Sequence, residues 1–223
     1  MEHSINIFSF LPADLVNKYL HVFMTIIVIL FTLLIGYVSK NMTNEVPGRL
    51  QGFFEVIVVS IKNMVVNVIG EEGKDYLPLI FGIGIYVFFS NILGLIPGFA
   101  SPTANLNSTV APALVVFFTY NYIGIKRHGF SYIKHFMGPV LWLAPFMIII
   151  EVIGHLARPL SLSVRLFGNI FGEDLVIAIL FMLVPYLVPL PMFFLGIFTC
   201  LLQTYIFIML TLIYIASALE ETH

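Results

Sequence analysis

Long apolar runs dominate the chain, and short polar segments separate them. A membrane-spanning helix needs about 20 apolar residues, and the first such run covers residues 20–39. Two further runs, 76–97 and 109–125, form a hairpin pair joined by a short polar loop. Residues 138–184 are apolar with few interruptions, and the last run covers 192–219. The pattern predicts an all-α membrane protein, in which about five membrane-embedded helices form a single domain that covers the whole chain.

The run at residues 48–69 has a different pattern. At 100° per residue, the polar side chains Gln51, Glu55 and Lys62 fall within roughly 40° of one another, and apolar side chains fill another face. An amphipathic helix of this kind lies in the membrane interface rather than across it. We therefore expect one interfacial helix in addition to the membrane-embedded ones.

The last two runs are longer than a membrane requires. At 1.5 Å per residue, residues 160–184 form ~37 Å of helix and residues 192–219 form ~42 Å, whereas the hydrocarbon core is ~30 Å thick. Both helices are therefore expected to tilt strongly. Pro159 interrupts the run 138–184, and the sequence leaves open whether it kinks one helix or separates two.

Charged residues are scarce. Of 223 residues, 60% are hydrophobic and 10% are charged, whereas a soluble domain carries roughly 25% charged residues. Lipid must therefore be the main solvent of this chain. The formal net charge is −2, and no basic stripe is present to bind a nucleic acid. A single cysteine, Cys200, excludes an intramolecular disulfide.

The lysines and arginines set the expected orientation. Most of them lie in two segments, at residues 40–74 and 126–134, and the joins at 98–108 and 185–191 have none. Cytoplasmic loops of membrane proteins carry the excess of Lys and Arg. We therefore expect the loop 126–136 in the cytoplasm, and the N-terminus and the loop at 98–108 outside.

One arginine, Arg165, lies deep in an apolar helix. It is six residues after Pro159 and some twenty before the next turn. An arginine in hydrocarbon costs from ~2.5 to well over 10 kcal/mol, and it cannot lose its proton to escape that cost. A structural arginine paired to an acid of the same chain is one interpretation. We favour a functional arginine, because ionisable residues inside membranes usually serve transport.

The residues that follow Arg165 share its helix face. Asn169 is one turn further along the helix and Glu173 is two turns further. Gly168 and Gly172 form an i,i+4 pair close to the same direction, and small residues in such positions let another helix approach closely. Ordinary packing within the chain would also explain two glycines. Next to an unpaired arginine, however, they suggest that an external helix passes close by.

Two acids flank Arg165 along the chain. Glu151 lies 14 residues before it and Asp174 lies nine after it, or about 21 Å and 13 Å along a continuous helix. One fixed cation between two acidic stations suits a proton path in two parts, because buried carboxylates can take up and release protons. His155 belongs either to this path or to an ion cluster with Arg158, and the second interpretation is the favoured one.

The last helix carries a glutamine in an apolar setting. Gln203 lies on the same side as Tyr214, and a buried amide is unfavourable in lipid without a partner. It should therefore face Asn169, Glu173 or Asp174 on the preceding helix. A purely structural hydrogen bond between the helices would satisfy the same requirement.

The loop around Asn105 and Asn107 is polar and uncharged. It could line a watery entrance on the outer side, or it could simply form a turn. Elsewhere the sequence has no metal-ligand spacing and no pairing of a nucleophile with a base. We therefore predict no catalytic residue, no cofactor and no metal site.

Two motifs resemble a known family. The sequence PLSLSVRLFGN at residues 159–169 is similar to the signature of subunit a of the membrane sector of bacterial F-type ATP synthases, and LQTYIFIMLTLIY at 202–214 resembles the last helix of that family. The order of segments is also similar: one span, an amphipathic helix, a hairpin and two long tilted helices. The resemblance covers nearly the whole chain, although it is diffuse before about residue 76.

This resemblance implies a mechanism and partners. Subunit a packs against a ring of c subunits, each with a carboxylate in mid-membrane, and provides two aqueous half-channels that end at the ring from opposite sides. The b subunits of the peripheral stalk and the rest of the complex are further partners, and the bacterial plasma (inner) membrane is the expected location. Subunit a is itself non-catalytic. By position, Arg165 is the stator arginine facing the ring; Asn169, Asp174 and Gln203 belong to the outer half-channel, and Glu151 and Ser161 to the inner one.

The sequence also departs from the family pattern. Many relatives share an acid and a histidine between the positions of Asp174 and Gly196, whereas here the histidine is absent and Glu173 adds a second acid. The sequence leaves open which of Glu173 and Asp174 titrates. Many relatives have an acid where Asn105 stands, so the outer entrance is expected to be less acidic here.

Two other classes of protein fit the sequence less well. A stand-alone ion channel or secondary transporter would predict a selectivity ring or an internal repeat, and the sequence shows neither. A structural membrane anchor would leave the cost of Arg165 unexplained.

Overall fold

The computed structural model describes residues 13–40, 48–96, 99, 101–129, 144–183 and 190–219, and within these ranges it contains helices and no strands. The prediction of an all-α membrane protein is confirmed, since six helices are long and apolar enough to cross a membrane. The elements in chain order are α1 (Ala13–Lys40), α2 (Arg49–Ile69), the 3₁₀ turn η1 (Glu71–Tyr76), α3 (Leu77–Gly94), the 3₁₀ turn η2 (Pro102–Ala104), α4 (Leu106–His128), α6 (Ala144–Leu183) and α7 (Leu190–Leu219).

Polar residues at the ends of the hairpin shift the helix boundaries from those expected. The first hairpin helix, α3, ends at Gly94 rather than residue 97, and a Cβ at Gly94 would lie 2.5 Å from Cβ of Ser101, so only glycine allows this close return of the chain. The second, α4, begins before residue 109 because Asn105 caps it, accepting a hydrogen bond from the Asn107 amide at 3.0 Å.

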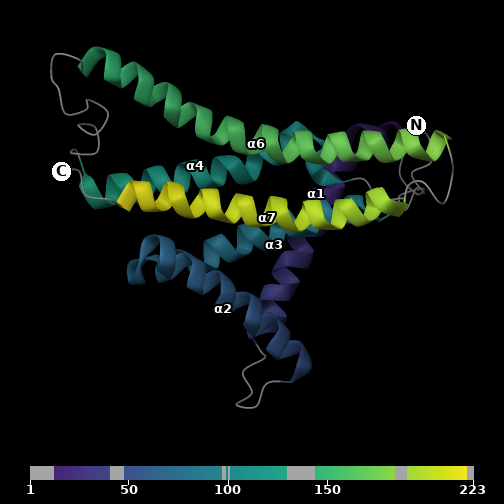
Figure 1. Cartoon of the computed structure of the whole chain (residues 1–223), viewed down its shortest axis with the longest axis horizontal. Coiled ribbons are helices and arrows are strands. Elements are labelled where there is room, and N and C mark those ends of the chain that lie inside the picture. The colour runs from purple at the N-terminus through teal and green to yellow at the C-terminus, as the bar shows by residue number, and fades with distance from the viewer. Residues whose placement is uncertain are drawn as a thin grey trace.

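The hairpin α3–α4, helix α7 and the second half of α6 run alongside one another (Figure 1). Their facing side chains form one apolar core, to which α2 also contributes. The backbones of α3 and α7 come close, because a Cβ at Gly84 would lie 2.7 Å from Cδ1 of Ile208. The fully buried members of this core include Val65, Ile80, Val87, Tyr120, Leu162, Leu166, Phe207, Leu212 and Ile215.

Helix α6 is one continuous helix through Pro159, which answers the question that the sequence left open. Its 40 residues correspond to about 60 Å, twice the thickness of a hydrocarbon core. Figure 1 shows α6 bent, and the bend opens away from α4 and α7. A proline inside a helix removes one backbone hydrogen bond and kinks the helix. Residues 138–143 and 184 of the expected run lie outside the described residues.

Helix α2 lies obliquely to these helices (Figure 1). It buries Ile61 and Val65 against the core, whereas Phe53 and Val56 on its other side are exposed. Gly70 ends the helix with a φ of +93°, a conformation that favours glycine. By length and composition α2 also qualifies as a candidate membrane span, and its position in the interface stays a prediction.

Charged residues of both basic segments meet at one end of the hairpin. Arg127, in the last turn of α4, donates from Nη1 to Oε2 of Glu72 in η1 at 2.8 Å. Lys74 pairs with Glu71 in the same turn. Leu219, the last residue of α7, lines a cavity with Glu72 and Arg127. The start of α3 and the ends of α4 and α7 therefore lie together, although residues 130–136 of the expected cytoplasmic loop are outside the described part of the chain.

Candidate functional site

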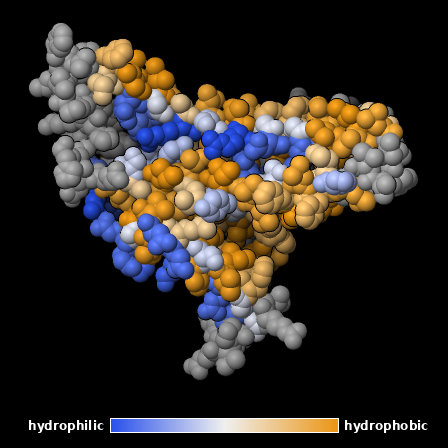
Figure 2. Space-filling model, viewed as in Figure 1, coloured by the Kyte–Doolittle hydropathy of each residue, from blue (hydrophilic) through white to orange (hydrophobic). Residues whose placement is uncertain are grey.

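Hydrophilic residues gather in a band along α6 and its seam with α7. Figure 2 shows this band in blue across a surface that is otherwise mostly orange. Because the surrounding surface is apolar enough for lipid, these polar side chains lie at membrane depth. Polar and ionisable groups in this position are costly and usually mark an ion or substrate pathway.

Arg165 is one of the polar residues of α6 and is partly buried. Among the residues that the structure describes, it makes no ion pair and no hydrogen bond to another side chain. The interpretation of Arg165 as a structural arginine paired to a neighbouring acid therefore finds no support in this fold. Its guanidinium can be compensated by an acid that approaches from outside the chain.

Arg158, one heptad earlier on α6, has a different setting. Its guanidinium carbon lies 5.5 Å from the ring centre of Tyr120 on α4 and 5.3 Å from that of Tyr214 on α7. Aromatic faces attract cations at such distances. The two tyrosines therefore compensate the charge of Arg158 within the chain.

Asn169 and Gln203 join α6 to α7. Nδ2 of Asn169 donates a hydrogen bond to Oε1 of Gln203 at 2.8 Å, and Gln203 is almost completely buried. The expected partner of Gln203 is thus confirmed. The bond satisfies a buried amide and places its remaining polar atoms one helical turn from Arg165.

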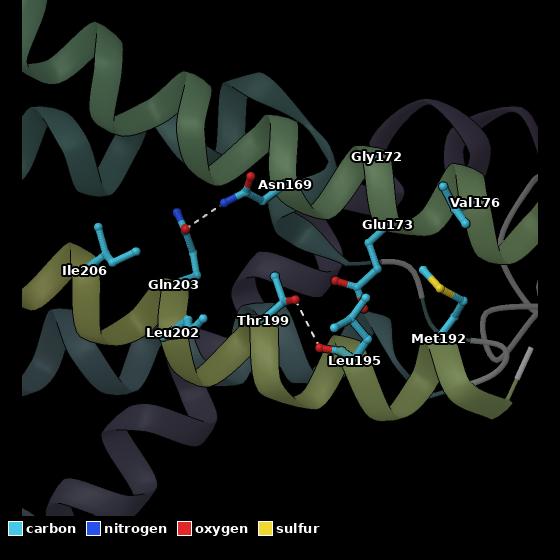
Figure 3. A pocket seen from close by; sticks show the side chains of 10 residues that line it. All are labelled: Asn169, Gly172, Glu173, Val176, Met192, Leu195, Thr199, Leu202, Gln203 and Ile206. Atoms are coloured by element: carbon cyan, nitrogen blue, oxygen red, sulfur yellow. Dashed lines mark hydrogen bonds between the residues drawn. The ribbon is translucent and has the colours of Figure 1, made fainter.

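A cavity of about 330 Å³ opens between α6 and α7 beside this bond. Figure 3 shows its lining, with Glu173 pointing from α6 across to α7. Neither carboxylate oxygen of Glu173 has a hydrogen-bond partner within the described chain. The residues that line the cavity are Asn169, Gly172, Glu173, Val176, Met192, Leu195, Thr199, Leu202, Gln203 and Ile206.

Gly196 on α7 makes room for Glu173. A Cβ at Gly196 would collide with Oε1 of Glu173, so the carboxylate occupies space that a side chain at Gly196 would fill. Glu173, the extra acid of the sequence, and Gly196 therefore face each other and share one volume.

Asp174 lies on a different face of α6 from Glu173. It is one turn from Ile170 and from Ile177, both of which are buried, so it shares their inward side. Asp174 is not among the residues that line the cavity. The two adjacent acids therefore sit in different surroundings.

The outer face of α6 next to Arg165 is open. No atom of the described residues lies within 4 Å of the place where a Cβ would stand at Gly168 or Gly172. Ser161, one turn before Arg165, is exposed. Gly168 is exposed, whereas Gly172 is partly buried and also lines the cavity between α6 and α7. Another helix can therefore approach α6 closely at Gly168.

A second polar cluster lies closer to the start of α6. Nε2 of His155 is 3.4 Å from Oε1 of Glu151, and Nδ1 of His155 is 3.1 Å from the hydroxyl of Tyr120. His155 is buried. The structure thus brings Glu151 together with a histidine whose place the sequence left open, and with a tyrosine from α4 that the sequence did not single out.

The predicted outer entrance has a local role in the fold. Asn105 caps α4 through the amide of Asn107, which agrees with the simple turn that the sequence allowed.

A buried polar cluster lies nearby, and the sequence analysis did not predict it. Ser101 donates to the Ser90 carbonyl at 3.0 Å, and the Thr103 hydroxyl donates to Oδ1 of Asn91 at 2.8 Å. The high density of Ser, Thr and Asn at residues 101–109 is the sequence feature that could have predicted this cluster.

No group of three or more His, Cys, Asp or Glu side chains in the described ranges is placed to hold a metal ion. These residues can exchange protons along the polar seam. Carboxylates lie on α6 both before and after Arg165, which carries a permanent positive charge. Together with the fold, this site defines a polytopic α-helical membrane protein of the ion-translocating class.

Comparisons with known proteins identify the family. The family model described as ATP synthase A chain matches residues 21–216. ATP synthase subunit a 3 of Pelobacter propionicus (strain DSM 2379 / NBRC 103807 / OttBd1) is 53% identical over 199 residues, which are 89% of this chain and 87% of that protein.

Two further relatives agree. ATP synthase subunit a of Syntrophobacter fumaroxidans (strain DSM 10017 / MPOB) is 52% identical over 204 residues, covering 91% of this chain and 85% of the relative. ATP synthase subunit a of Geobacter sulfurreducens (strain ATCC 51573 / DSM 12127 / PCA) is 50% identical over 199 residues, or 89% and 87%. This chain belongs to the ATP synthase A chain family.

Proposed function

We propose that this protein is the proton-translocating stator subunit of a bacterial F-type ATP synthase, working against a ring of c subunits. The observation that carries the proposal is Arg165, a membrane-embedded cation without an ion pair among the described residues, with the exposed Gly168 next to it on α6. A ring of helices with mid-membrane carboxylates supplies both the missing negative charge and the helix that Gly168 admits.

The outer half-channel consists of the cavity and the groups around it. Asp174 and Glu173 are the acids that exchange protons there, and the Asn169–Gln203 pair carries the polar lining up to Arg165. We assign the buried polar cluster of Ser101, Thr103 and Asn91 to the outer end of this path, because it lies at the outer loop. A cavity of this size and polarity can hold several waters.

Arg165 separates the two half-channels. Its permanent charge favours the ionised form of a ring carboxylate that passes it, so the carboxylate releases its proton. The same charge opposes a proton that would move directly from one half-channel to the other. Protons therefore cross only by riding on the ring, and the membrane potential, ~2.3 kcal/mol per charge per 100 mV, biases the rotation.

The inner half-channel leads from Arg165 past Ser161 to Glu151. Ser161 is exposed on the open face of α6, and Glu151 is partly buried about 21 Å from Arg165 along the helix. Under the proposed orientation, Glu151 lies towards the cytoplasm. A proton released at the ring then reaches Glu151 through water held along this face.

The orientation can be tested by chemical labelling. We expect a cysteine at Lys126 to react from the cytoplasmic side of intact cells, and a cysteine at Asn107 from outside. Both positions are exposed. Reaction of both positions from the same side would contradict the orientation.

The decisive experiment removes the charge of Arg165. Arg165→Ala should stop ATP synthesis after an acid pulse, and it should let protons leak passively through vesicles stripped of the soluble ATPase head. The leak is expected because the barrier between the half-channels is gone. An assembled Arg165→Ala complex without a leak would show that another group separates the two paths.

A stand-alone channel or transporter is the competing function. Purification separates the two ideas, since the stator subunit should copurify with a ring of small hairpin proteins, the b subunits and a soluble ATPase head. A chain that conducts protons in liposomes without any of these partners would support the competing function instead.

A further inference from the structure

His155 holds a position that the proposed path does not require. It is one turn after Glu151 on α6, and its two ring nitrogens face different groups: Nε2 faces Oε1 of Glu151 at 3.4 Å and Nδ1 faces the hydroxyl of Tyr120 at 3.1 Å. Its side chain is 9% exposed, and that of Glu151 is 35% exposed. The acid therefore reaches the protein surface, whereas the imidazole behind it lies within the protein.

The donors and acceptors of this trio allow two protonation states. An ionised carboxylate can only accept, so Nε2 must carry a hydrogen when Glu151 is charged. Nδ1 then either accepts from the hydroxyl of Tyr120 or, in the imidazolium, donates to it. Because a hydroxyl both donates and accepts, Tyr120 satisfies His155 in either state.

The surroundings fix the imidazole firmly. Tyr120 is itself buried and is clamped by Arg158, whose guanidinium carbon lies 5.5 Å from the centre of its ring. Tyr214 packs against the other side of this cluster, with its ring centre 5.9 Å from that of Tyr120. Within the part of the chain that the structure describes, the charged and titratable groups of this cluster are Glu151 and Arg158 on α6, Tyr120 on α4 and Tyr214 on α7.

We propose that His155 and Glu151 form a proton-holding pair in the inner half-channel, with Tyr120 as its positioning residue. A proton that reaches Glu151 passes to Nε2 when the neutral imidazole carries its hydrogen on Nδ1, where it donates to the hydroxyl of Tyr120. The carboxylic acid and neutral imidazole then become a carboxylate and an imidazolium with a hydrogen on each ring nitrogen. The reverse transfer returns the proton to Glu151, and water at its exposed side carries it away. The pair gains and loses one proton in each cycle. This inference rests on the proposed function, because it assigns His155 to the inner path.

The test is the dependence of proton flux on pH at the cytoplasmic side. Purified ATP synthase in liposomes would be assayed for ATP-driven proton pumping between about pH 5 and 8, the range in which histidine is the side chain that normally changes charge. His155→Gln keeps hydrogen-bonding groups towards Glu151 and Tyr120 but does not titrate. We expect its pumping rate to fall about three- to tenfold and its pH profile to become flatter than that of the wild type.

Coupling between the two residues is the second readout. Glu151→Gln should lower the rate by a similar factor, and the double variant should be no slower than the slower single variant, because two members of one unit are not additive. Ser163→Ala is the matched control, since Ser163 is buried on α6 but bonds only its own helix, to the Leu160 carbonyl. It should leave both rate and profile unchanged.

Three results would overturn the inference. They are an assembled His155→Gln enzyme with the wild-type rate and profile, a double variant whose losses multiply, and a Ser163→Ala enzyme that changes as His155→Gln does. If His155→Gln does not assemble, Tyr120→Phe decides, because it keeps the ring against Arg158 and removes only the hydroxyl. Its pH profile should shift, and an unchanged profile would also overturn the inference.

The proposed function is tested separately in the same vesicles by the passive leak of Arg165→Ala. A leak together with a wild-type profile for His155→Gln would reject only the role of His155. The absence of a leak would reject the proposed function itself.

Discussion

Two arginines lie one heptad apart on α6, and they have opposite surroundings. Arg158 lies between the rings of Tyr120 and Tyr214, at 5.5 and 5.3 Å from their centres. Arg165 is about 10 Å further along the same side of the helix, and it has no ion pair among the described residues. The first charge is compensated by the fold, and the second is left for a partner.

The difference shows how a single helix can combine support with function. The positive charge of an arginine inside the membrane must be compensated in every long-lived state of the protein. The aromatic clamp at Arg158 provides this compensation permanently, and it also ties α6 to α4 and α7. At Arg165 the described residues offer no ion pair and Gly168 leaves open space beside it, so a carboxylate of a partner can provide the compensation.

The strongest test of this contrast replaces each arginine by lysine. Lysine keeps the charge but concentrates it on a flexible point donor that can lose its proton when buried. Arg165→Lys should lower acid-pulse ATP synthesis by at least about 100-fold, or about 2.7 kcal/mol, in a complex that still assembles. Arg158→Lys should keep most of the synthesis rate, since a lysine can also sit over an aromatic face.

The comparison would fail if the two variants had similar rates. Normal synthesis by Arg165→Lys would mean that charge alone suffices at this position. Severe loss in Arg158→Lys would place both arginines in the proton path.

The next effect concerns the two acids on the outer side of Arg165. Asp174→Asn should slow proton-driven ATP synthesis more than Glu173→Gln does, about tenfold against about threefold, because Asp174 matches the titratable position of the family. Rates in inverted vesicles at equal levels of assembled enzyme are the measurement. A wild-type rate for Asp174→Asn would move the role to Glu173 or to water.

A smaller effect is expected at the contact between α6 and α7. A methyl group in Gly196→Ala would collide with the carboxylate of Glu173, and overpacking of this kind typically costs about 1–3 kcal/mol. We expect lower thermal stability of the purified complex and slower proton flux. Adding Glu173→Ala should restore part of the stability, because it removes the carboxylate but leaves Leu95, whose Cδ2 would lie 2.5 Å from the new methyl group. Equal stability of Gly196→Ala and wild type would show that Glu173 moves aside freely.

The smallest effect is expected for the clamp itself. Tyr214→Leu removes one of the two aromatic faces around Arg158, which is worth about 0.5–2 kcal/mol. The midpoint of thermal disassembly should fall by a few degrees, roughly 2–4 °C per kcal/mol, with little change in synthesis rate. A large loss of rate without loss of stability would instead give Tyr214 a role in proton transfer.

The sequence predicted the fold well because apolar runs have a direct physical meaning in lipid. A run of about 20 apolar residues can only be satisfied as a helix across or within the membrane, and each of the expected runs contains a long helix. The boundaries were less accurate. The early start of α4 depends on a cap at Asn105, and the early end of α3 depends on the close approach of Ser101 to Gly94.

The candidate site was predictable only where it follows one helix. Arg165, Asn169 and Glu173 share a face of α6, so helical periodicity was enough to group them. Tyr120 lies 35 residues before its partner His155, and this contact depends on how α4 packs against α6. The carboxylate of Glu173 likewise lies where a side chain at position 196 would lie. This contact depends on how closely α6 and α7 approach each other, and a single sequence does not give that distance.

The bend in α6 has a geometric consequence. A straight helix of 40 residues would be about 60 Å long, twice the ~30 Å thickness of a hydrocarbon core. A bend shortens the distance between the two ends of a rod, and kinking is one way in which a long hydrophobic helix adjusts to a thinner bilayer. The bend that Figure 1 shows therefore reduces the thickness of lipid that α6 needs, and Pro159 inside this helix is the usual cause of such a bend. One residue of the backbone is thus linked to the membrane thickness that the whole helix can fit.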